Sequence, residues 1–269
     1  MRQLVRYMMI VTMALGMLVP SACNKIPDNS GDENSKQNLL DLLNQECKTY
    51  RDQKINSAAM SRAMKYTIWL PGGYDSSKEY PFLYLLHGYG DDNNSWIEKG
   101  GADRIAKDYM TRGGTPMVIV MPDGLVNFYS GTWEKYFHEE LIPTVEKDFK
   151  CNGKRAVAGL SMGGYGTLYN VLNHPDKFTF GYAMSPATDL EGFEKLVTAQ
   201  ASPSVFPPIV LESGTQDYTV SIASVKDFSA MLTKHNVKHE MIERDGGHDW
   251  AFWPVCLEKA LKKIGESFK

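Results

Sequence analysis

Short apolar runs alternate with longer amphipathic segments along most of this chain. Met64–Leu70 alternates apolar and polar residues, which is typical of a strand with one exposed face. Phe82–Leu86 is continuously apolar and bounded by turn residues, as in a strand buried on both faces. From there, strand-like and helix-like segments alternate toward the C-terminus. This order predicts an α/β fold with a mostly parallel central sheet, helices on both faces and antiparallel strands at the start.

The pattern also places the expected elements. We expect strands at residues 49–56, 63–70, 82–86, 117–121, 155–158, 178–184, 208–212 and 238–242. We expect helices at residues 101–111, 132–149, 162–172, 221–234 and 250–264. Residues 189–208 have no readable pattern. Because 43% of the 269 residues are hydrophobic and no internal repeat occurs, one domain with a large core accounts for the chain.

Gly159–Gly164 lies where a predicted strand turns into a predicted helix, and it reads Gly-Leu-Ser-Met-Gly-Gly. Such a turn leaves its central side chain outside the sheet, while glycines on either side let neighbouring elements approach closely. A glycine-rich turn with an incidental serine is the alternative. Ser161 is therefore a candidate nucleophile whose partners should lie on other loops.

Those partners are sought after strands, because ligands of an open α/β sheet bind at the carboxyl ends of the strands. His248 follows the last predicted strand and has two glycines before it. It could remove the Ser161 proton and pass it to a leaving alcohol. A helix-capping or surface histidine is the alternative. His87 also ends a strand, but its His-Gly loop suits another task.

An acid that orients His248 should lie between Ser161 and His248 and should also follow a strand. Asp217 meets both conditions, and its carboxylate could accept the imidazole N–H and fix the tautomer. A role in shaping the turn is the alternative. Weaker candidates for the acid are Asp189, Glu212, Asp245 and Asp249.

Two backbone N–H groups are candidates for an oxyanion hole, which stabilises negative charge on a substrate carbonyl. Met162 directly follows the nucleophile at a predicted helix N-terminus. Tyr89 lies in the loop after the buried strand, between two glycines that let the backbone bend inward. A simple strand-ending turn is the alternative for that loop.

The N-terminus predicts export. Arg2 and Arg6 precede the apolar stretch Tyr7–Val19, which is too short to span a bilayer but has the length of a signal-peptide core. Cys23 follows small residues at its end, as in a bacterial lipoprotein signal, so we expect a lipid on Cys23 and anchoring to a bacterial membrane, at the periplasmic face or cell surface. A soluble secreted protein is the alternative. The expected divisions are a signal peptide at 1–22, a polar tether at 23–37 and the catalytic domain at 38–269.

Composition removes several other classes of function. The formal net charge is −3, with Lys and Arg scattered rather than clustered, which argues against a nucleic-acid partner. Cys47, Cys151 and Cys256 are an odd number, so at least one should be a free thiol. No C-x-x-C motif and no Cys/His pair has zinc-ligand spacing, and the acidic segment at 91–94 fits no calcium loop. We expect neither a metal nor a cofactor.

Four motifs occur in order: Leu85–Gly90, Trp133–Phe149, Ala158–Gly164 and Gly246–Trp250. Together they resemble the esterase D-like esterases, and within that group the chain looks most like bacterial feruloyl and acetyl xylan esterases of carbohydrate esterase family 1. The resemblance covers about residues 60–269. It implies an α/β-hydrolase fold and a metal-free serine esterase. By this resemblance Ser161, Asp217 and His248 match the triad, and Met162 and Tyr89 match the oxyanion positions.

The resemblance also implies a substrate class, since an exported esterase suits ester-decorated plant polysaccharide such as xylan. The expected reaction removes feruloyl or acetyl groups through an acyl-enzyme on Ser161. Trp250, Trp133 and His87 are candidate substrate contacts because aromatic faces pack against sugars and phenolic groups. Core packing is the commoner role for each tryptophan.

Three other functions stay open at this point. Two are a general short-chain acyl esterase and a thioesterase similar to S-formylglutathione hydrolase, although export argues against a glutathione thioester. The third is a catalytically silent glycan-binding surface lipoprotein. Acetyl or feruloyl preference also stays open, because the segment at 189–208 carries no readable pattern.

Overall fold

The structure is a computed structural model that describes residues 46–200, 202 and 205–269. The predicted signal peptide, Cys23 and the predicted tether lie outside the described residues. Within the described ranges, no helix combines the length and the apolar character needed to cross a membrane.

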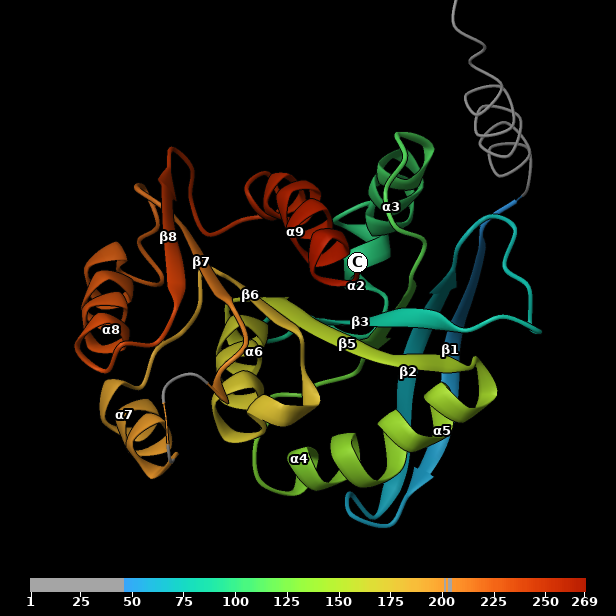
Figure 1. Ribbon diagram of the computed structural model, residues 1–269, viewed down its shortest axis with the longest axis horizontal. Coiled ribbons are helices and arrows are strands. Elements are labelled where there is room, and N and C mark those ends of the chain that lie inside the picture. The colour runs from blue at the N-terminus through green and yellow to red at the C-terminus, as the bar shows by residue number, and fades with distance from the viewer. Residues whose placement is uncertain (1–45, 201, 203–204) are drawn as a thin grey trace, which may run out of the picture.

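Within these ranges, eight strands form one sheet in the order β1-β2-β4-β3-β5-β6-β7-β8 (Figure 1). Strand β2 pairs antiparallel with β1 and β4, and the pairs from β4 to β8 are parallel. The predicted α/β fold with antiparallel strands at the start is confirmed. The strands are β1 (Lys48–Ser57), β2 (Arg62–Leu70), β3 (Tyr80–Leu86), β4 (Val118–Pro122), β5 (Cys151–Leu160), β6 (Phe180–Met184), β7 (Ile209–Gly214) and β8 (His239–Arg244).

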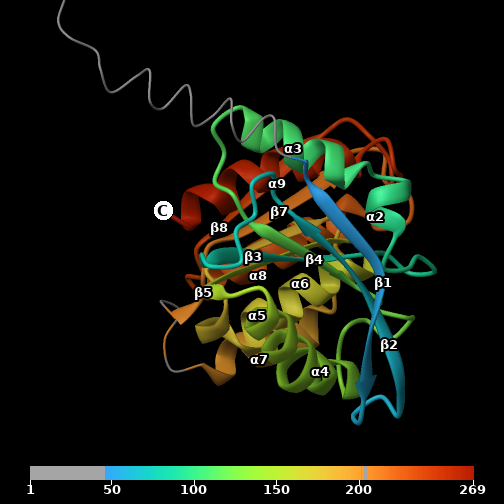
Figure 2. The same cartoon turned by 90° about the vertical axis from the view of Figure 1, so that its right-hand side faces the viewer.

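Helices cover both faces of the sheet (Figure 2). One face carries α2 (Ser95–Glu98), α3 (Ala102–Thr111) and α9 (Trp253–Ser267). The other face carries α4 (Thr132–Tyr136), η1 (Phe137–Leu141), α5 (Ile142–Asp148), α6 (Met162–Asn173), α7 (Leu190–Ala199) and α8 (Ile222–Lys234). A short turn of helix, η2 (Pro175–Lys177), follows α6.

Strand side chains divide between two cores because successive residues point to opposite faces. In β3, Phe82 and Tyr84 pack toward α4–α6, while Leu83 and Leu85 pack toward α3 and α9. All residues of β3 are buried, which explains its continuous apolar sequence. Burial on both faces fixes the register and hence the positions of the loops at the strand ends.

Two helical regions differ from the sequence-based expectation. The helix expected at 132–149 contains a π-helical turn, η1, between α4 and α5. Pro143 lacks the N–H that would reach the Glu139 carbonyl, which fits a local widening there. The patternless region also contains α7, which buries Phe193 and Val197.

Candidate active site

Ser161 lies at the sharp turn between β5 and α6. Its backbone has φ 54° and ψ −113°, a conformation that non-glycine residues rarely adopt. The Ser161 N–H donates to the Met184 carbonyl at 2.9 Å, which ties the turn to β6. A Cβ atom at Gly159 would lie 2.4 Å from the Gly163 carbonyl oxygen, so the turn requires glycine there. Strand and helix therefore hold the Ser161 side chain at a fixed exit from the sheet.

The structure brings Ser161, His248 and Asp217 together in one hydrogen-bonded chain. His248 Nε2 lies 2.9 Å from Ser161 Oγ, and His248 Nδ1 lies 2.7 Å from Asp217 Oδ2. The Asp217 carboxylate can only accept, so Nδ1 carries the proton and Nε2 is free to accept from the serine hydroxyl. This is the geometry and the tautomer that proton removal from Ser161 requires.

Asp217 is held by the backbone around it. Its Oδ1 accepts the N–H groups of Thr219 at 2.9 Å and Val220 at 2.7 Å. Its side chain is 0% exposed. Only Oδ2 is left for His248, so the carboxylate is fixed in position and direction.

Trp253 packs against the imidazole. The two rings meet edge to face with centroids 5.1 Å apart, and the indole N–H points toward Ser185 Oγ at 3.4 Å. The sequence prediction selected Trp250 for this neighbourhood. Trp250 instead packs against Trp253 and Trp96, with 5.2 Å between the ring centroids in each pair.

The loop after β3 approaches the serine closely. A Cβ atom at Gly88 would lie 2.7 Å from the end of the Leu160 side chain, which would have to shift, and 3.7 Å from the Ser161 Cβ, so glycine lets this loop lie against the serine. The Tyr89 N–H follows directly. Neither this N–H nor that of Met162, at the first position of α6, has an acceptor among the described residues.

His87 fixes the direction of the Tyr89 N–H. The Gly124 N–H donates to His87 Nε2 at 2.8 Å, so Nδ1 carries the proton and donates to the Gly88 carbonyl at 2.8 Å. In a planar trans peptide the N–H points opposite to the carbonyl. Holding the Gly88 carbonyl against the imidazole therefore turns the Tyr89 N–H the other way.

A buried group of charges, here called the ion cluster, links the ends of β7 and β8. Glu212 is 0% exposed and accepts hydrogen bonds from Arg244 Nε at 2.6 Å, Lys259 Nζ at 2.7 Å and the Tyr182 hydroxyl at 2.5 Å. Burial alone would raise the pKa of Glu212, but these hydrogen bonds outweigh it and hold the pKa below its ordinary value. Glu212, Arg244, Lys259 and Tyr182 form the cluster.

Arg244 also closes the loop that carries His248. Its Nη2 donates to the Phe252 carbonyl at 2.5 Å, and its guanidinium carbon lies 3.4 Å above the centre of the Phe252 ring. Arg244 precedes the histidine loop and Phe252 follows it. One side chain thus joins the two ends of the segment that positions His248.

The other residues considered as substrate contacts or as the acid for His248 have other roles in the structure. Trp133 is fully buried and donates its indole N–H to the Asp123 carbonyl, and His87 is 1% exposed, so neither ring is available to a substrate in this structure. Asp189 caps α7 by accepting the Gly192 N–H. Asp249 accepts N–H groups of the following turn, and Asp245 accepts from Thr215.

Sequence reasoning missed two aromatic residues near the serine. Tyr165 lies one turn after Ser161 on α6, and its N–H donates to the Ser161 carbonyl at 3.0 Å. Phe128 lies in the loop after β4, and the two ring centroids are 5.5 Å apart. The one available signal was an aromatic pair between Asn127 and Gly131 at a strand end, where a connecting loop has no need of large rings.

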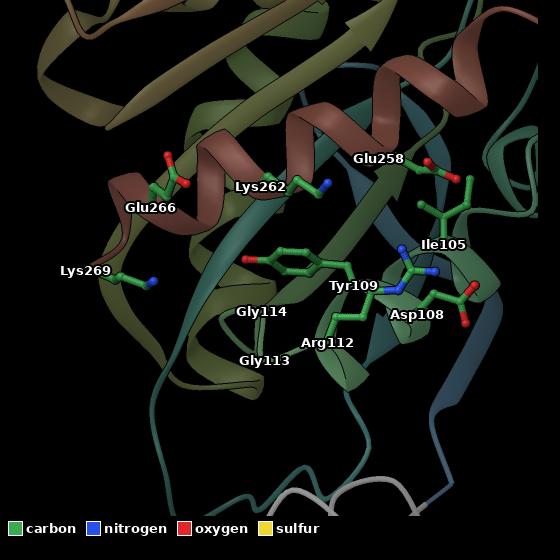
Figure 3. Close-up of a pocket in the computed structure, with 10 residues that line it drawn as sticks. All are labelled: Ile105, Asp108, Tyr109, Arg112, Gly113, Gly114, Glu258, Lys262, Glu266 and Lys269. Carbon is green, nitrogen blue, oxygen red and sulfur yellow. The ribbon is translucent and has the colours of Figure 1, made fainter. Parts of the chain in front are cut away.

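A separate pocket of about 210 Å³ lies between α3 and α9 (Figure 3). Tyr109 lies within it, among charged side chains of both signs. No residue of the Ser161 site lines it. Its lining residues are Ile105, Asp108, Tyr109, Arg112, Gly113, Gly114, Glu258, Lys262, Glu266 and Lys269.

The described residues contain no group of three or more His, Cys, Asp or Glu side chains that could hold a metal ion. In the acidic segment at 91–94, Asp91 pairs with Lys99, and Asn93 donates to Thr67 and Asp52. Cys47, Cys151 and Cys256 are free thiols.

Curated relatives of this chain include a xylanase/feruloyl esterase and an acetyl esterase. The endo-1,4-beta-xylanase/feruloyl esterase of Xylanibacter ruminicola is 28% identical over 227 residues, which are 77% of this chain and 30% of that enzyme. The acetyl esterase of Caldicellulosiruptor saccharolyticus is 26% identical over 230 residues, which are 69% of this chain and 84% of that enzyme. This chain also covers only 24% of two matching esterases of Mycobacterium tuberculosis.

Solved structures agree in fold. A ferulic acid esterase superposes with a TM-score of 0.76 at 26% identity, covering 84% of this chain and 100% of that chain. An S-formylglutathione hydrolase of Staphylococcus aureus has a TM-score of 0.66 at 20% identity, covering 82% and 97% of the two chains, which shows the fold alone. The family described as "Putative esterase" matches residues 57–264. With its α/β-hydrolase fold, the chain belongs to this esterase family.

Proposed function

We propose that the protein is a serine carboxylic ester hydrolase that removes feruloyl or acetyl groups from plant polysaccharide. The observation that carries the proposal is the chain of hydrogen bonds from Ser161 Oγ through His248 to Asp217, with spacings of 2.9 and 2.7 Å. Each link has a donor and an acceptor in the state that the first proton transfer needs.

In the first half of the reaction, Ser161 Oγ attacks the ester carbonyl carbon while its proton moves to His248 Nε2. Asp217 stabilises the resulting imidazolium through the Nδ1–H bond. The carbonyl oxygen becomes an oxyanion, for which the N–H groups of Met162 and Tyr89 are the donors. His248 then gives its proton to the leaving alcohol, the ester C–O bond breaks, and an acyl group stays on Ser161.

In the second half, water takes the place of the alcohol. His248 accepts a proton from the water as its oxygen attacks the acyl carbon, and the Ser161–acyl bond breaks as that proton returns to Oγ. The carboxylic acid leaves. The chain's own residues supply each proton transfer, so the sequence of steps needs no further group.

Two kinds of support favour plant polysaccharide as the substrate. The Xylanibacter relative is described as a xylanase/feruloyl esterase and the Caldicellulosiruptor relative as an acetyl esterase. The signal-like segment before Cys23 favours export and a lipid anchor, which would place the enzyme where such polymers are met.

Ser161→Ala tests the nucleophile. Turnover of 4-nitrophenyl acetate should fall by at least about 10⁴-fold, because the covalent route is lost, while circular dichroism and the melting temperature stay close to the wild type. Ser224→Ala on α8 is the matched control and should keep full activity. Retained hydrolysis in Ser161→Ala would exclude the proposed mechanism.

A fluorophosphonate probe separates the enzyme from a silent glycan-binding lipoprotein. The native protein should be labelled on Ser161, and labelling should disappear on unfolding and in Ser161→Ala. Absence of labelling in the native protein would favour the binding protein.

The anchor has its own test. Expressed as the full chain in a bacterium, the wild type should fractionate with membranes and incorporate radiolabelled palmitate. Cys23→Ala should lose both properties. Membrane association that survives in Cys23→Ala would argue against lipidation at this cysteine.

A further inference from the structure

The acid and the base of the hydrogen-bonded chain lie on loops that follow two neighbouring strands. Asp217 comes three residues after Gly214, the last residue of β7, and His248 comes four residues after Arg244, the last residue of β8 (Figure 1). The strands are parallel, and Gly214 and Arg244 are their last paired residues. The 2.7 Å between Asp217 Oδ2 and His248 Nδ1 therefore depends on how the two strand ends are held together.

Backbone hydrogen bonds join the two loops just after the strands. The Thr215 N–H donates to the Arg244 carbonyl at 2.9 Å, and the Gln216 N–H donates to the Gly246 carbonyl at 3.0 Å. A Cβ atom at Gly214 would lie 2.2 Å from the Gly246 carbonyl oxygen, so the loops touch where no side chain separates them. Neither bond reaches the acid or the base, and the histidine loop beyond Gly246 needs another attachment.

That attachment is the Arg244 side chain, and Glu212 sets its direction. Glu212 lies on β7, five residues before Asp217, and its buried carboxylate accepts from Arg244 Nε at 2.6 Å. Arg244 Nη2 donates to the Phe252 carbonyl at 2.5 Å. Because the guanidinium is planar and rigid, the directions of Nε and Nη2 are fixed relative to each other. The far end of the histidine loop is thus held at a set distance from the strand that precedes the acid.

The attached carbonyl is next to the ring that packs on the imidazole. Trp253 follows Phe252, and its indole meets the His248 ring edge to face with centroids 5.1 Å apart. Lys259 donates to Glu212 at 2.7 Å, so the helix that begins at Trp253 is tied to the same carboxylate. Release of this carbonyl would let both rings shift, and the imidazole would turn away from its acid.

We propose that Glu212 and Arg244 form a positioning pair that fixes the base His248 against its acid. The inference rests on the proposed ester hydrolysis at Ser161, to which it adds two residues that act through others. Within the described part of the chain, neither side chain forms a hydrogen bond with a triad residue. A purely structural pair would affect stability alone, whereas a positioning pair must also change the rate of proton transfer.

Arg244→Lys is the first test. It keeps a positive charge beside Glu212 but lacks the planar fork that reaches the Phe252 carbonyl at the same time. We expect kcat for 4-nitrophenyl acetate to fall by about 10- to 100-fold with KM within about twofold, because the base moves while substrate contacts stay. Lys226→Arg makes the matched exchange in the exposed pair with Glu243 and should stay within about twofold. An unchanged kcat in folded Arg244→Lys would overturn the inference.

Chemical rescue tests whether the guanidinium group itself restores the position. Arg244→Ala leaves a space beside the Glu212 carboxylate that matches a free guanidinium ion. Guanidinium chloride at about 10 mM, far below denaturing concentrations, should raise kcat of this variant at least about fivefold, and sodium chloride at the same concentration should not. The wild type and Lys226→Ala should not respond. A melting temperature that rises with guanidinium while kcat stays low would show that the pair is structural only.

The Nδ1 proton of His248 gives a readout that does not depend on turnover. A proton in a short, charge-assisted hydrogen bond is strongly deshielded, so its nuclear magnetic resonance signal lies downfield of ordinary backbone N–H groups. The signal should be present in the wild type and absent in Asp217→Asn, which assigns it. In Arg244→Lys it should move upfield or broaden, and in Lys226→Arg it should stay unchanged. An unmoved signal in Arg244→Lys would overturn the inference even where kcat has fallen.

The outcomes separate this inference from the proposed function. If the wild type hydrolyses the ester while Arg244→Lys loses stability but keeps kcat and the downfield signal, the pair is structural and esterase activity stands. If the wild type hydrolyses no ester and takes up no fluorophosphonate, yet the signal responds to Arg244→Lys as expected, the proposed function fails and the pair still positions His248. Should Arg244→Ala not fold, Arg244→Lys carries the test alone.

Discussion

The two sides of β5 are held in place by different physical means. On the side of β7 and β8, Asp217 and His248 are fixed by short hydrogen bonds, and the buried ion cluster closes the histidine loop. On the side of β3 and β4, Phe128 lies on a loop with three left-handed residues, Leu125, Phe128 and Tyr129. One side therefore relies on charge, and the other on packing and backbone strain.

The buried polar groups behind each side differ in the same way. On the side of β7 and β8, the buried carboxylate of Glu212 is charged and forms ion pairs with Arg244 and Lys259. On the other side of β5, His138 of η1 contacts Asn170. The Asn170 amide nitrogen donates to the Gly166 carbonyl, so its Oδ1 faces the imidazole and accepts a hydrogen bond from His138 Nε2. His138 Nδ1 is buried and has no hydrogen-bond partner among the described residues. The first group is charged and paired at both carboxylate oxygens, whereas the second is neutral near pH 7 and paired at one ring nitrogen.

The largest expected effect comes from the charged side. Asp217→Asn keeps the shape but offers an amide where His248 Nδ1–H needs an acceptor, so Nε2 no longer presents a free lone pair. We expect kcat for 4-nitrophenyl acetate to fall by about 10³- to 10⁴-fold, as is typical for a misoriented tautomer. Asp245→Asn, an acid of the histidine loop outside this chain of bonds, should stay within about twofold. Equal effects of the two variants would remove Asp217 from the acid position.

Arg244→Met tests whether the ion cluster supports that side. The change leaves a buried carboxylate with one cation fewer, so urea unfolding should show a loss of about 3–5 kcal/mol. Lys226→Met removes an exposed pair with Glu243, 2.9 Å in length, and should cost less than about 1 kcal/mol. Similar losses in the two variants would mean that the ion cluster does not hold the loop more firmly than a surface pair does.

His138 gives a pH-dependent contrast for the other side. Burial, with the neighbouring charges of His174 and Lys177, lowers the pKa of His138 to about 4 despite the opposing effects of the hydrogen bond to Asn170 and the charge of Glu134. The unfolded chain, with a pKa of about 6.5, takes up this proton first as the pH falls. Stability should therefore drop between pH 6.5 and 4, by at most about 3 kcal/mol.

His138→Gln keeps a donor for Asn170 and cannot titrate. Its unfolding free energy should depend less on pH in that window than the wild type's, as measured by urea midpoints at several pH values. The lowered pKa of Glu134, where hydrogen bonds from His174 and Tyr169 outweigh burial, adds an acid-side loss to both proteins and cancels in the comparison. Parallel curves for the two proteins would show that His138 is not the titrating group.

The smallest effect concerns backbone strain alone. Phe128→Gly and Phe128→Ala both remove the ring, but only glycine adopts φ near 55° without cost. Phe128→Gly should be the more stable of the two by about 1 kcal/mol in thermal unfolding. If alanine is as stable as glycine, the loop is not strained and its geometry needs no further explanation.

The sequence predicted most of the fold because burial dictates where apolar residues stand along each strand and helix. The continuous apolar run of β3 and the glycine-flanked Ser161 each have a local cause, so the strand and the turn could be read directly. Helix α7 was missed because residues 189–208 showed no readable pattern, and Asp189, weighed as a weaker candidate for the acid, caps that helix by accepting a hydrogen bond. A cap and a catalytic carboxylate are chemically alike, and only the surroundings distinguish them.

The site was less predictable wherever a role depends on long-range contacts. Glu212 was weighed as an acid for His248, yet its partners Arg244 and Lys259 come from residues 32 and 47 positions later. Trp250 and Trp253 are equally aromatic in sequence, and only the start of α9 decides which ring meets the imidazole. Phe128 gave no periodic signal because its loop has no repeating geometry.

The His87 side chain connects the loop after β3 to the loop after β4. Its imidazole accepts from Gly124 at one end and donates to Gly88 at the other, which extends the link between β3 and β4 beyond their last paired residues. The loop that holds Phe128 and the peptide that carries the Tyr89 N–H are therefore connected through the His87 side chain. A displacement of the backbone at Gly124 would therefore reach, through the His87 imidazole, the peptide whose N–H is a candidate oxyanion donor.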